Sequence, residues 1–257
     1  MNPGIDNPVI DLLSRHRSIR KFNSRPVGDD TLKGLVKAAQ CASTSHHVQA
    51  YTIIQVKDSE NRQAIADLAG PQPWVAQAPV FLVFCADLTR LVAAARHHGV
   101  PEEIGWAEQL IVATVDTALV AQNLMVAAES MGLGGVFIGG IRNDPEQVCD
   151  LLNIPDQAFP VFGLCLGYPE QIPDTKPRLP VTQVLRQDYF QAPGEKENSS
   201  GLPKEVTNFD GTLHNYYKNR DSNLKDQTWT GQMAELTGRI IRPWMKAFLE
   251  KKGFFRR

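Results

Sequence analysis

The segment from Arg15 to Arg25 concentrates positive charge in a chain that is nearly neutral overall. It contains five arginines and lysines, one histidine and no acidic residue, whereas the 257-residue chain has a formal net charge of −1. Guanidinium groups present paired N–H donors that match phosphate oxygens, and the Ser18 hydroxyl lies inside the run. The segment therefore predicts an anion site, with a solvated basic surface as the alternative.

A second, shorter basic group is Lys176-Pro177-Arg178. It follows an apolar run at 161–167, and loops after buried strands commonly carry ligand contacts. A basic group of this size is more often plain exposed surface. Its significance depends on whether it shares a ligand with the first group.

Two uncharged segments have side chains or backbone suited to a flat, polar ligand. The run from Ser43 to Ser45, followed by Gln49, offers hydroxyls and an amide, although a capping turn would use the same residues. The segment from Gly134 to Gly140 lets a ligand approach the backbone closely, or serves as a tight turn with close packing. It contains no G-x-G-x-x-G pattern, so it is not a dinucleotide fingerprint.

Several other chemistries are disfavoured by spacing. The His46-His47 and His97-His98 pairs lack metal-ligand spacing, so we expect no metal site. No G-x-S-x-G motif supports a hydrolase. None of the four cysteines forms a C-x-x-C pair, and we expect structural burial for them, with a reactive thiol left open for Cys41.

Hydrophobic periodicity predicts alternating helices and strands. Helices are expected at 9–16, 31–41, 59–69, about 106–131, from 144 onward and about 226–249, with Asp29 or Asp30 capping the second. Strands are expected at 51–57, 79–86, 136–138 and 161–167, and a loop is expected around His97 and His98. The 106–131 helix is apolar nearly all round, which favours burial partly against a second subunit.

Composition bounds the class of protein. Hydrophobic residues make up 42% and charged residues 21%, as in soluble globular chains. The acidic and amide residues Asp116, Gln122, Asn123 and Glu129 between Leu110 and Met131 argue against a membrane span. No secretory signal is evident, and we expect a cytoplasmic protein. We expect one domain over 1–257, in which 181–257 is a C-terminal extension with an exposed excursion at about 191–204.

Taken in order, these motifs resemble the nitroreductase superfamily, and most of all its branch of oxygen-insensitive NADPH nitroreductases and NADPH-flavin oxidoreductases. The motifs are HRSIRKF at 16–22, STS…Q at 43–49, PQPWVAQAPVFLVFCAD at 71–87, AEQ…VDTALVAQNLMVAAESMGLGGVFIGGIRN at 107–143 and FGLCLGYP…KPRLP at 162–180. The resemblance covers nearly the whole chain. It implies an α+β, nitroreductase-like fold with a central mixed β-sheet flanked by helices, and a homodimer with two FMN sites at the subunit interface.

The resemblance also implies site residues. No catalytic group is expected beyond bound FMN, with Arg20 as the candidate that tunes the flavin ring. Arg220 matches a position that meets the 2′-phosphate of NADPH, and Lys225 falls near a further basic position. The FMN-binding positions are matched by His16, Arg17, Ser18, Arg20, Thr44, Gln72, Ile138, Gly139, Gly140, Lys176 and Arg178.

The implied activity is FMN-dependent, two-electron, ping-pong hydride transfer from NADPH to nitroaromatics, quinones or related small acceptors. A dedicated NAD(P)H:flavin reductase would share every motif, and a non-catalytic flavin-binding module is a remote alternative. The strength of NADPH over NADH selection is open because Asp221 follows Arg220, and acceptor preference is open because His47 replaces an apolar or aromatic residue. Nucleic-acid binding is disfavoured by the neutral charge and the lack of interleaved aromatics.

Overall fold

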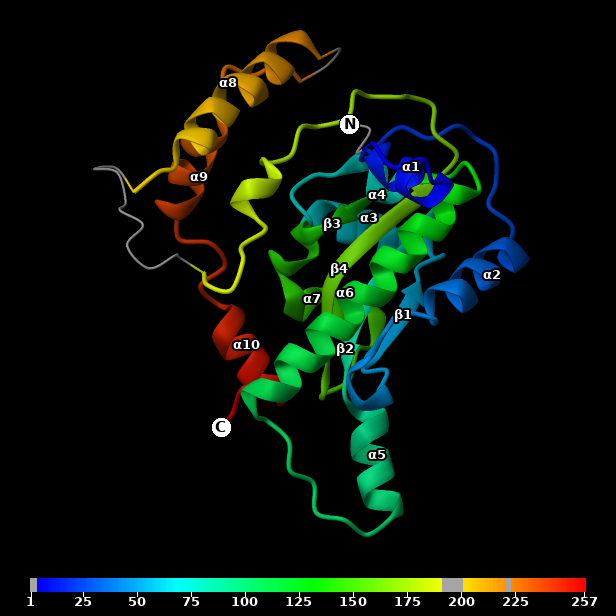
Figure 1. Cartoon of the computed structure of the whole chain (residues 1–257). Coiled ribbons are helices and arrows are strands. Elements are labelled where there is room, and N and C mark those ends of the chain that lie inside the picture. The colour runs from blue at the N-terminus through cyan, green and yellow to red at the C-terminus, as the bar shows by residue number, and fades with distance from the viewer. Residues whose placement is uncertain (1–3, 191–200, 221–222) are drawn as a thin grey trace. The chain divides into compact units, whose positions relative to one another are not determined.

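The computed structural model describes residues 4–190, 201–220 and 223–257. The chain forms two compact units, one of Met1–Ile172 with Arg242–Arg257 and the other of Pro173–Ile241. We call them the sheet unit and the helical unit, and each is described by itself (Figure 1). Most of the expected 191–204 excursion lies outside the described residues.

The sheet unit contains a four-stranded sheet in the order β1-β2-β4-β3. Its strands are β1 (Tyr51–Gln55), β2 (Val80–Asp87), β3 (Gly134–Ile138) and β4 (Ala158–Gly167). All three strand pairings are antiparallel, so the sheet is antiparallel rather than mixed. Between β1 and β2, for example, the chain passes through two helices, which bring it back to the end of the sheet at which β1 finished. A single parallel bridge joins Ser18 to Gly135.

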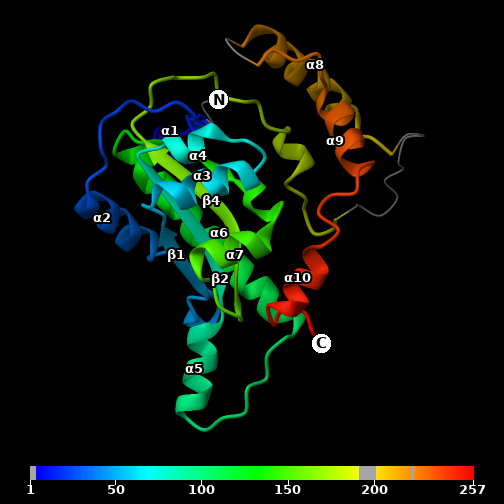
Figure 2. The same cartoon turned by 180° about the vertical axis from the view of Figure 1, so that it is seen from behind.

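Helices cover both faces of this sheet. Figures 1 and 2 show α2 and α6 on one face and α3, α4 and α7 on the other. The helices of the unit are α1 (Pro8–Ser14), α2 (Asp29–Ala39), α3 (Ser59–Leu68), α4 (Pro73–Gln77), α5 (Thr89–His97), α6 (Ala107–Ser130), α7 (Pro145–Leu152) and α10 (Met245–Lys251), with 3-10 turns η1 (Ser45–His47) and η2 (Gly139–Arg142).

Strand β2 supplies side chains to two hydrophobic clusters, because successive residues of a strand point to opposite faces. Leu82 and Phe84 pack in the cluster that contains Leu124 of α6. Phe81 and Val83 belong to the cluster on the other face. Every residue of β2 is buried, as its continuous apolar run predicted.

The long helix α6 is confirmed within one residue of its expected ends. By length and composition it could cross a membrane, a test that the core helix of a soluble protein also passes. Here one side of α6 is buried in the unit, including the polar Asp116 and Thr117. The opposite side leaves Ile111, Val115 and Leu119 between 41% and 56% exposed.

The structure corrects the expected helices at several points. The expected loop is present from His98 onward, but His97 is the last residue of helix α5, and neither α5 nor α4 was expected. The single helix expected at 226–249 is two helices, because a break containing Gly238 and Pro243 separates α9 (Trp229–Thr237) from α10. Helix α2 begins after Gly28, so Asp29 and Asp30 lie in its first turn and do not cap it. Their negative charges interact favourably there with the positive end of the helix dipole.

The helical unit consists of η3 (Val181–Gln183), α8 (Lys204–Asn219) and α9 (Trp229–Thr237). Helix α8 was not expected as a helix. It buries Phe209, Leu213 and Tyr217 along one side, at the spacing of successive helical turns, and Trp229 packs against them.

Candidate functional site

The basic segment at 16–22 lies against the first residues of β3. The backbone N–H of Ile19 donates to the carbonyl of Gly135 at 2.9 Å, and the Ile19 side chain is buried. A Cβ at Gly134 would lie only 2.6 Å from Cγ1 of Ile19, so only glycine allows this approach. With Ile19 pointing inward, Ser18 and Arg20 are exposed beside it. The sheet therefore holds this segment by its backbone.

Arg17 lines a cavity of about 290 Å³. Arg15 and Glu129 line it too, together with apolar residues such as Leu12 and Pro169. The Nε atom of Arg17 is buried and has no hydrogen-bond partner among the described residues. An anion in this cavity would satisfy that donor, since a buried guanidinium N–H costs free energy when it is unpaired. The anion site at Arg17 stays a prediction from the sequence.

His16 makes a hydrogen bond to an acidic side chain at the edge of the same region. Its Nδ1 lies 2.6 Å from Oε1 of Glu129, in the last turn of α6. The Glu129 side chain is only 11% exposed. Glu129 was not anticipated from the sequence; its acidic charge beside a basic cluster is visible only once α6 is packed.

A second group of expected residues gathers at the end of β3. A Cβ at Gly140 would lie 2.6 Å from Nε2 of Gln72, so glycine permits close approach here. The Arg20 guanidinium lies 5.7 Å from the ring centroid of Trp74, within cation–π range. The indole N–H of Trp74 is buried without a partner in the described chain. Ile138 is buried, so only its backbone is available to a ligand.

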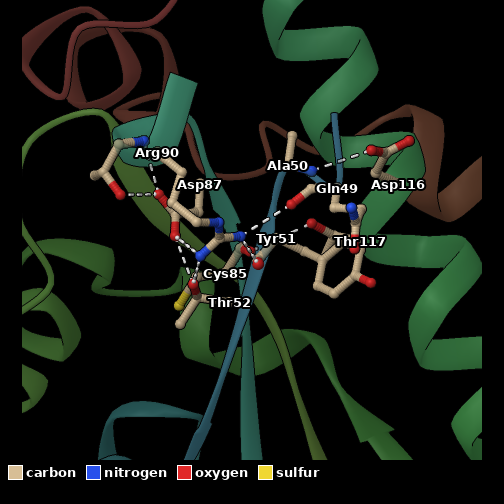
Figure 3. A network of polar contacts seen from close by, with 10 residues as sticks. Gln49, Ala50, Tyr51, Thr52, Cys85, Asp87, Arg90, Asp116 and Thr117 are labelled. Carbon is tan, nitrogen blue, oxygen red and sulfur yellow. Dashed lines mark hydrogen bonds and ion pairs between the residues drawn. The ribbon is translucent and has the colours of Figure 1, made fainter. Parts of the chain in front are cut away.

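Thr44 belongs to a different network, anchored on the buried carboxylate of Asp116. The Thr44 hydroxyl donates to Oδ2 at 2.5 Å, and the backbone N–H groups of Ser45 and Ala50 donate to the same carboxylate at 3.1 Å each. Figure 3 shows the Ala50 bond. Asp116 precedes Glu129 on α6 by a distance of about 20 Å along the helix axis. Within one chain, Thr44 therefore lies far from His16.

The loop after Thr44 is strained. His46, His47 and Gln49 adopt left-handed φ values of 47°, 58° and 49°, which cost of the order of 1 kcal/mol or more each. These residues line a cavity of about 710 Å³. Among the residues that the structure describes, no group of three potential metal ligands occurs.

Arg90 fastens this loop to the sheet (Figure 3). It donates to the carbonyl of Gln49 at 2.9 Å, to the Thr52 hydroxyl at 3.0 Å and to the Asp87 carboxylate at 3.2 Å. Burial alone would raise the pKa of Asp87. Hydrogen bonds from Thr52 and Thr89, with the charge of Arg90, instead hold its pKa below the ordinary value.

In the helical unit, two expected site residues contact the ring of Tyr217, and two others bond to nearby backbone carbonyls. The ammonium of Lys176 lies 5.3 Å, and the guanidinium of Arg220 4.6 Å, from the ring centroid of Tyr217. The backbone N–H of Lys225 donates to the Tyr217 carbonyl at 3.3 Å. Arg178 donates to the carbonyl of Lys176 at 2.7 Å.

Tyr217 is 4% exposed and donates its hydroxyl to Oε1 of Gln232 at 3.1 Å. Burial raises its pKa, but hydrogen bonding to Lys176 and Gln232, with the charges of Lys176 and Lys225, lowers it below the ordinary value. The Nε atom of Arg220 is buried and unpaired among the described residues. Tyr217 was missed from the sequence, although its position one helical turn before Arg220 was a usable signal.

Three of the four cysteines are buried, as the sequence predicted. Cys85, Cys149 and Cys165 are buried, and Cys41 is exposed. Burial raises the pKa of Cys149 to about 11 and that of Cys165 to about 12, so these thiols are protonated at neutral pH.

Comparison with known proteins assigns the family. The model of the nitroreductase family matches residues 13–168, and that of the nitroreductase family, C-terminal domain, matches residues 176–257. The chain is 41% identical over 249 residues to an oxygen-insensitive NADPH nitroreductase of Salmonella typhimurium, covering 96% of this chain and 98% of the relative. It is 38% identical over 250 residues to an FMN reductase (NADPH) of Bacillus subtilis, with the same coverage.

The fold agrees with these matches. The solved structure of NfrA1 from B. megaterium superposes with a TM-score of 0.90 at 42% identity, covering 97% of this chain and 100% of that one. The chain therefore belongs to the nitroreductase family. The resemblance and the α+β fold inferred from the sequence motifs are confirmed, whereas the individual site residues stay predictions.

Proposed function

We propose that the chain is an FMN-dependent NADPH oxidoreductase that reduces nitroaromatics, quinones or related small acceptors in two-electron steps. The observation that carries this proposal is the unpaired Arg17 donor at a cavity beside the sheet-bound 16–22 segment. Relatives over nearly the full length are named as an NADPH nitroreductase and an FMN reductase, which supports the same chemistry.

The expected site residues suit both the phosphate end and the ring end of FMN. Arg17, with His16 and Ser18, would hold the phosphate end in the sheet unit. The roles of Lys176 and Arg178 stay predictions from the sequence. The ring end would lie against Arg20, Gln72 and the backbone at Ile138, Gly139 and Gly140. A Cβ at Gly140 would collide with the carbonyl of Ala69 and with Nε2 of Gln72, so this position requires glycine.

When bound, FMN supplies the hydride chemistry, accepting two electrons from NADPH and passing them to the acceptor. The protein positions both reactants. Arg20, on the face of Trp74, is the residue that would stabilise the negative charge of the reduced ring. In the helical unit, Arg220 and Lys225 are proposed to contact the 2′-phosphate of NADPH, and the unpaired Nε of Arg220 is a donor suited to it.

We also propose a homodimer. Ile111, Val115 and Leu119 form an exposed apolar stripe on α6 at four-residue spacing, which a second copy would cover. Thr44, distant from His16 in its own chain, would then serve the partner's FMN site. Sedimentation equilibrium at micromolar concentration tests this, and a monomer there would contradict it. NADPH as donor and four free cysteines suit a reducing compartment, which supports a cytoplasmic location.

The decisive experiment removes the phosphate contact. Arg17→Ala should raise the dissociation constant of FMN by about 10- to 100-fold, the value of a charge-assisted hydrogen bond. Binding of riboflavin, which lacks the phosphate, should change little. An unchanged FMN constant would contradict the assignment.

Two alternatives are separated by kinetics. A dedicated flavin reductase, like the B. subtilis relative by its name, would show a far larger kcat/KM for free FMN than for nitrofurazone. A non-catalytic flavin-binding module would leave its bound flavin oxidised after stopped-flow mixing with NADPH. Rapid bleaching of the bound flavin followed by reoxidation with nitrofurazone is the result that we expect.

A further inference from the structure

An acidic side chain lies inside the most basic region of the sheet unit. Glu129 lines the same cavity as Arg15 and Arg17, and its carboxylate is 2.6 Å from Nδ1 of His16. A carboxylate repels a bound phosphate by direct Coulomb interaction. If Glu129 is useful for binding an anion, it therefore acts through another residue.

His16 is the residue through which it can act. A carboxylate that accepts from Nδ1–H fixes the orientation of the ring and leaves Nε2 on the opposite side. In the neutral ring, Nε2 is an acceptor and cannot donate to a phosphate oxygen. In the imidazolium, both nitrogens donate, one to Glu129 and the other to an anion.

The charges on the elements around His16 oppose one another. Arg15 and Arg17 carry positive charge on its own segment. Glu129 on α6 carries negative charge beside the ring, and Asp11 is the acidic residue of the neighbouring α1. A bound phosphate adds negative charge beside the ring and so favours the imidazolium. Protonation of His16 and binding of phosphate therefore assist each other.

We propose that Glu129 and His16 form a proton-coupled phosphate clamp. When FMN binds, His16 takes up one proton from solvent, donating Nδ1–H to Glu129 and Nε2–H to a phosphate oxygen. Glu129 is a positioning residue in this clamp. The inference rests on the FMN site proposed above.

Titration calorimetry of the apoprotein at pH 8 tests the clamp directly. At this pH the phosphate of FMN is already a dianion, so it takes no part in proton exchange. Measured in buffers of different ionisation enthalpy, FMN should bind with uptake of a substantial fraction of a proton, and riboflavin with none. Absence of proton uptake with FMN would overturn the proposal.

Substitutions identify the residue that takes up the proton. His16→Gln should abolish the uptake, and Glu129→Gln, which keeps the size but removes the charge, should reduce it by at least half and weaken FMN binding about tenfold. The matched control is Glu108→Gln, an exposed glutamate on the same helix, which should behave as the parent. Full uptake in Glu129→Gln, or tighter FMN binding, would reject the role of Glu129.

The outcomes separate this inference from the proposed site. If Arg17→Ala leaves FMN binding intact, the phosphate site itself is misplaced. If Arg17→Ala weakens FMN binding but no proton is taken up, the site stands and only the clamp fails. Nitrogen-15 NMR of the His16 ring adds a direct readout: both nitrogens should be protonated in the FMN complex, and one in the apoprotein.

Discussion

The sheet unit and the helical unit hold their candidate binding residues by different means. In the sheet unit, carboxylates do this: Asp116 holds the Thr44 loop, Asp87 receives Arg90 and Glu129 receives His16. In the helical unit, the ring of Tyr217 contacts the cations of Lys176 and Arg220. Both arrangements orient charged or polar groups.

The difference predicts different consequences of substitution. Hydrogen bonds to a buried carboxylate are directional, and losing the acceptor leaves several donors unsatisfied. Cation–π contacts are weaker and tolerate small displacements of the cation. Changes to the anchors of the sheet unit should therefore cost folding stability, whereas changes in the helical unit should chiefly alter ligand affinity. Four predictions test this contrast.

The largest effect is expected for Asp116→Ala. It leaves the Thr44 hydroxyl and two backbone N–H groups without their acceptor, so the free energy of unfolding should fall by about 3–5 kcal/mol. Urea unfolding followed by circular dichroism measures this. Glu108→Ala, on the exposed side of the same helix, should stay within about 0.5 kcal/mol of the parent. If Asp116→Ala lowered the free energy of unfolding by less than about 1 kcal/mol, the proposed contrast between the two units would be wrong.

Arg220→Ala is expected to have the next largest effect, on binding rather than folding. The KM for NADPH should rise about tenfold, since one charge-assisted contact to the 2′-phosphate is lost. The KM for NADH should change little. Arg220→Lys should recover part of the loss, because lysine keeps the charge but not the planar donors. Equal increases for both coenzymes would remove Arg220 from this role.

Tyr217→Leu tests the ring as an anchor. Without the ring, Arg220 and Lys176 lose their cation–π contacts, and the KM for NADPH should rise about fivefold. Tyr217→Phe keeps the ring and should change this KM less than twofold. If Phe and Leu behave alike, the hydroxyl bond to Gln232 is the anchor instead.

The smallest effect concerns acid stability. Because the pKa of Asp87 is lower in the folded protein than its ordinary value of 3.8, its contribution to stability is fully present above that pH. It is lost as the pH falls through the folded pKa. Asp87→Asn should therefore lose less stability between pH 5 and 3 than the parent does. Asp30→Asn, at an exposed position, is the control and should follow the parent.

The elements that could be predicted were those with a strong local pattern. The α6 helix and the buried β2 strand followed from apolar periodicity and run length. Helix α5 was missed because its histidines suggested a loop, and α8 because a polar stretch precedes it. The break between α9 and α10 was signalled by Pro243, which was overlooked.

The sequence by itself determined the family, the α+β class and the basic segment at 16–22, because these depend on residue identity, order and local charge. Only the tertiary structure decided which acidic or aromatic groups orient those residues. Glu129 meets His16, Asp116 meets Thr44, and Tyr217 meets Lys176 across 113, 72 and 41 positions of the chain. Such pairings arise from packing of helices and strands, and no local pattern in the sequence encodes them.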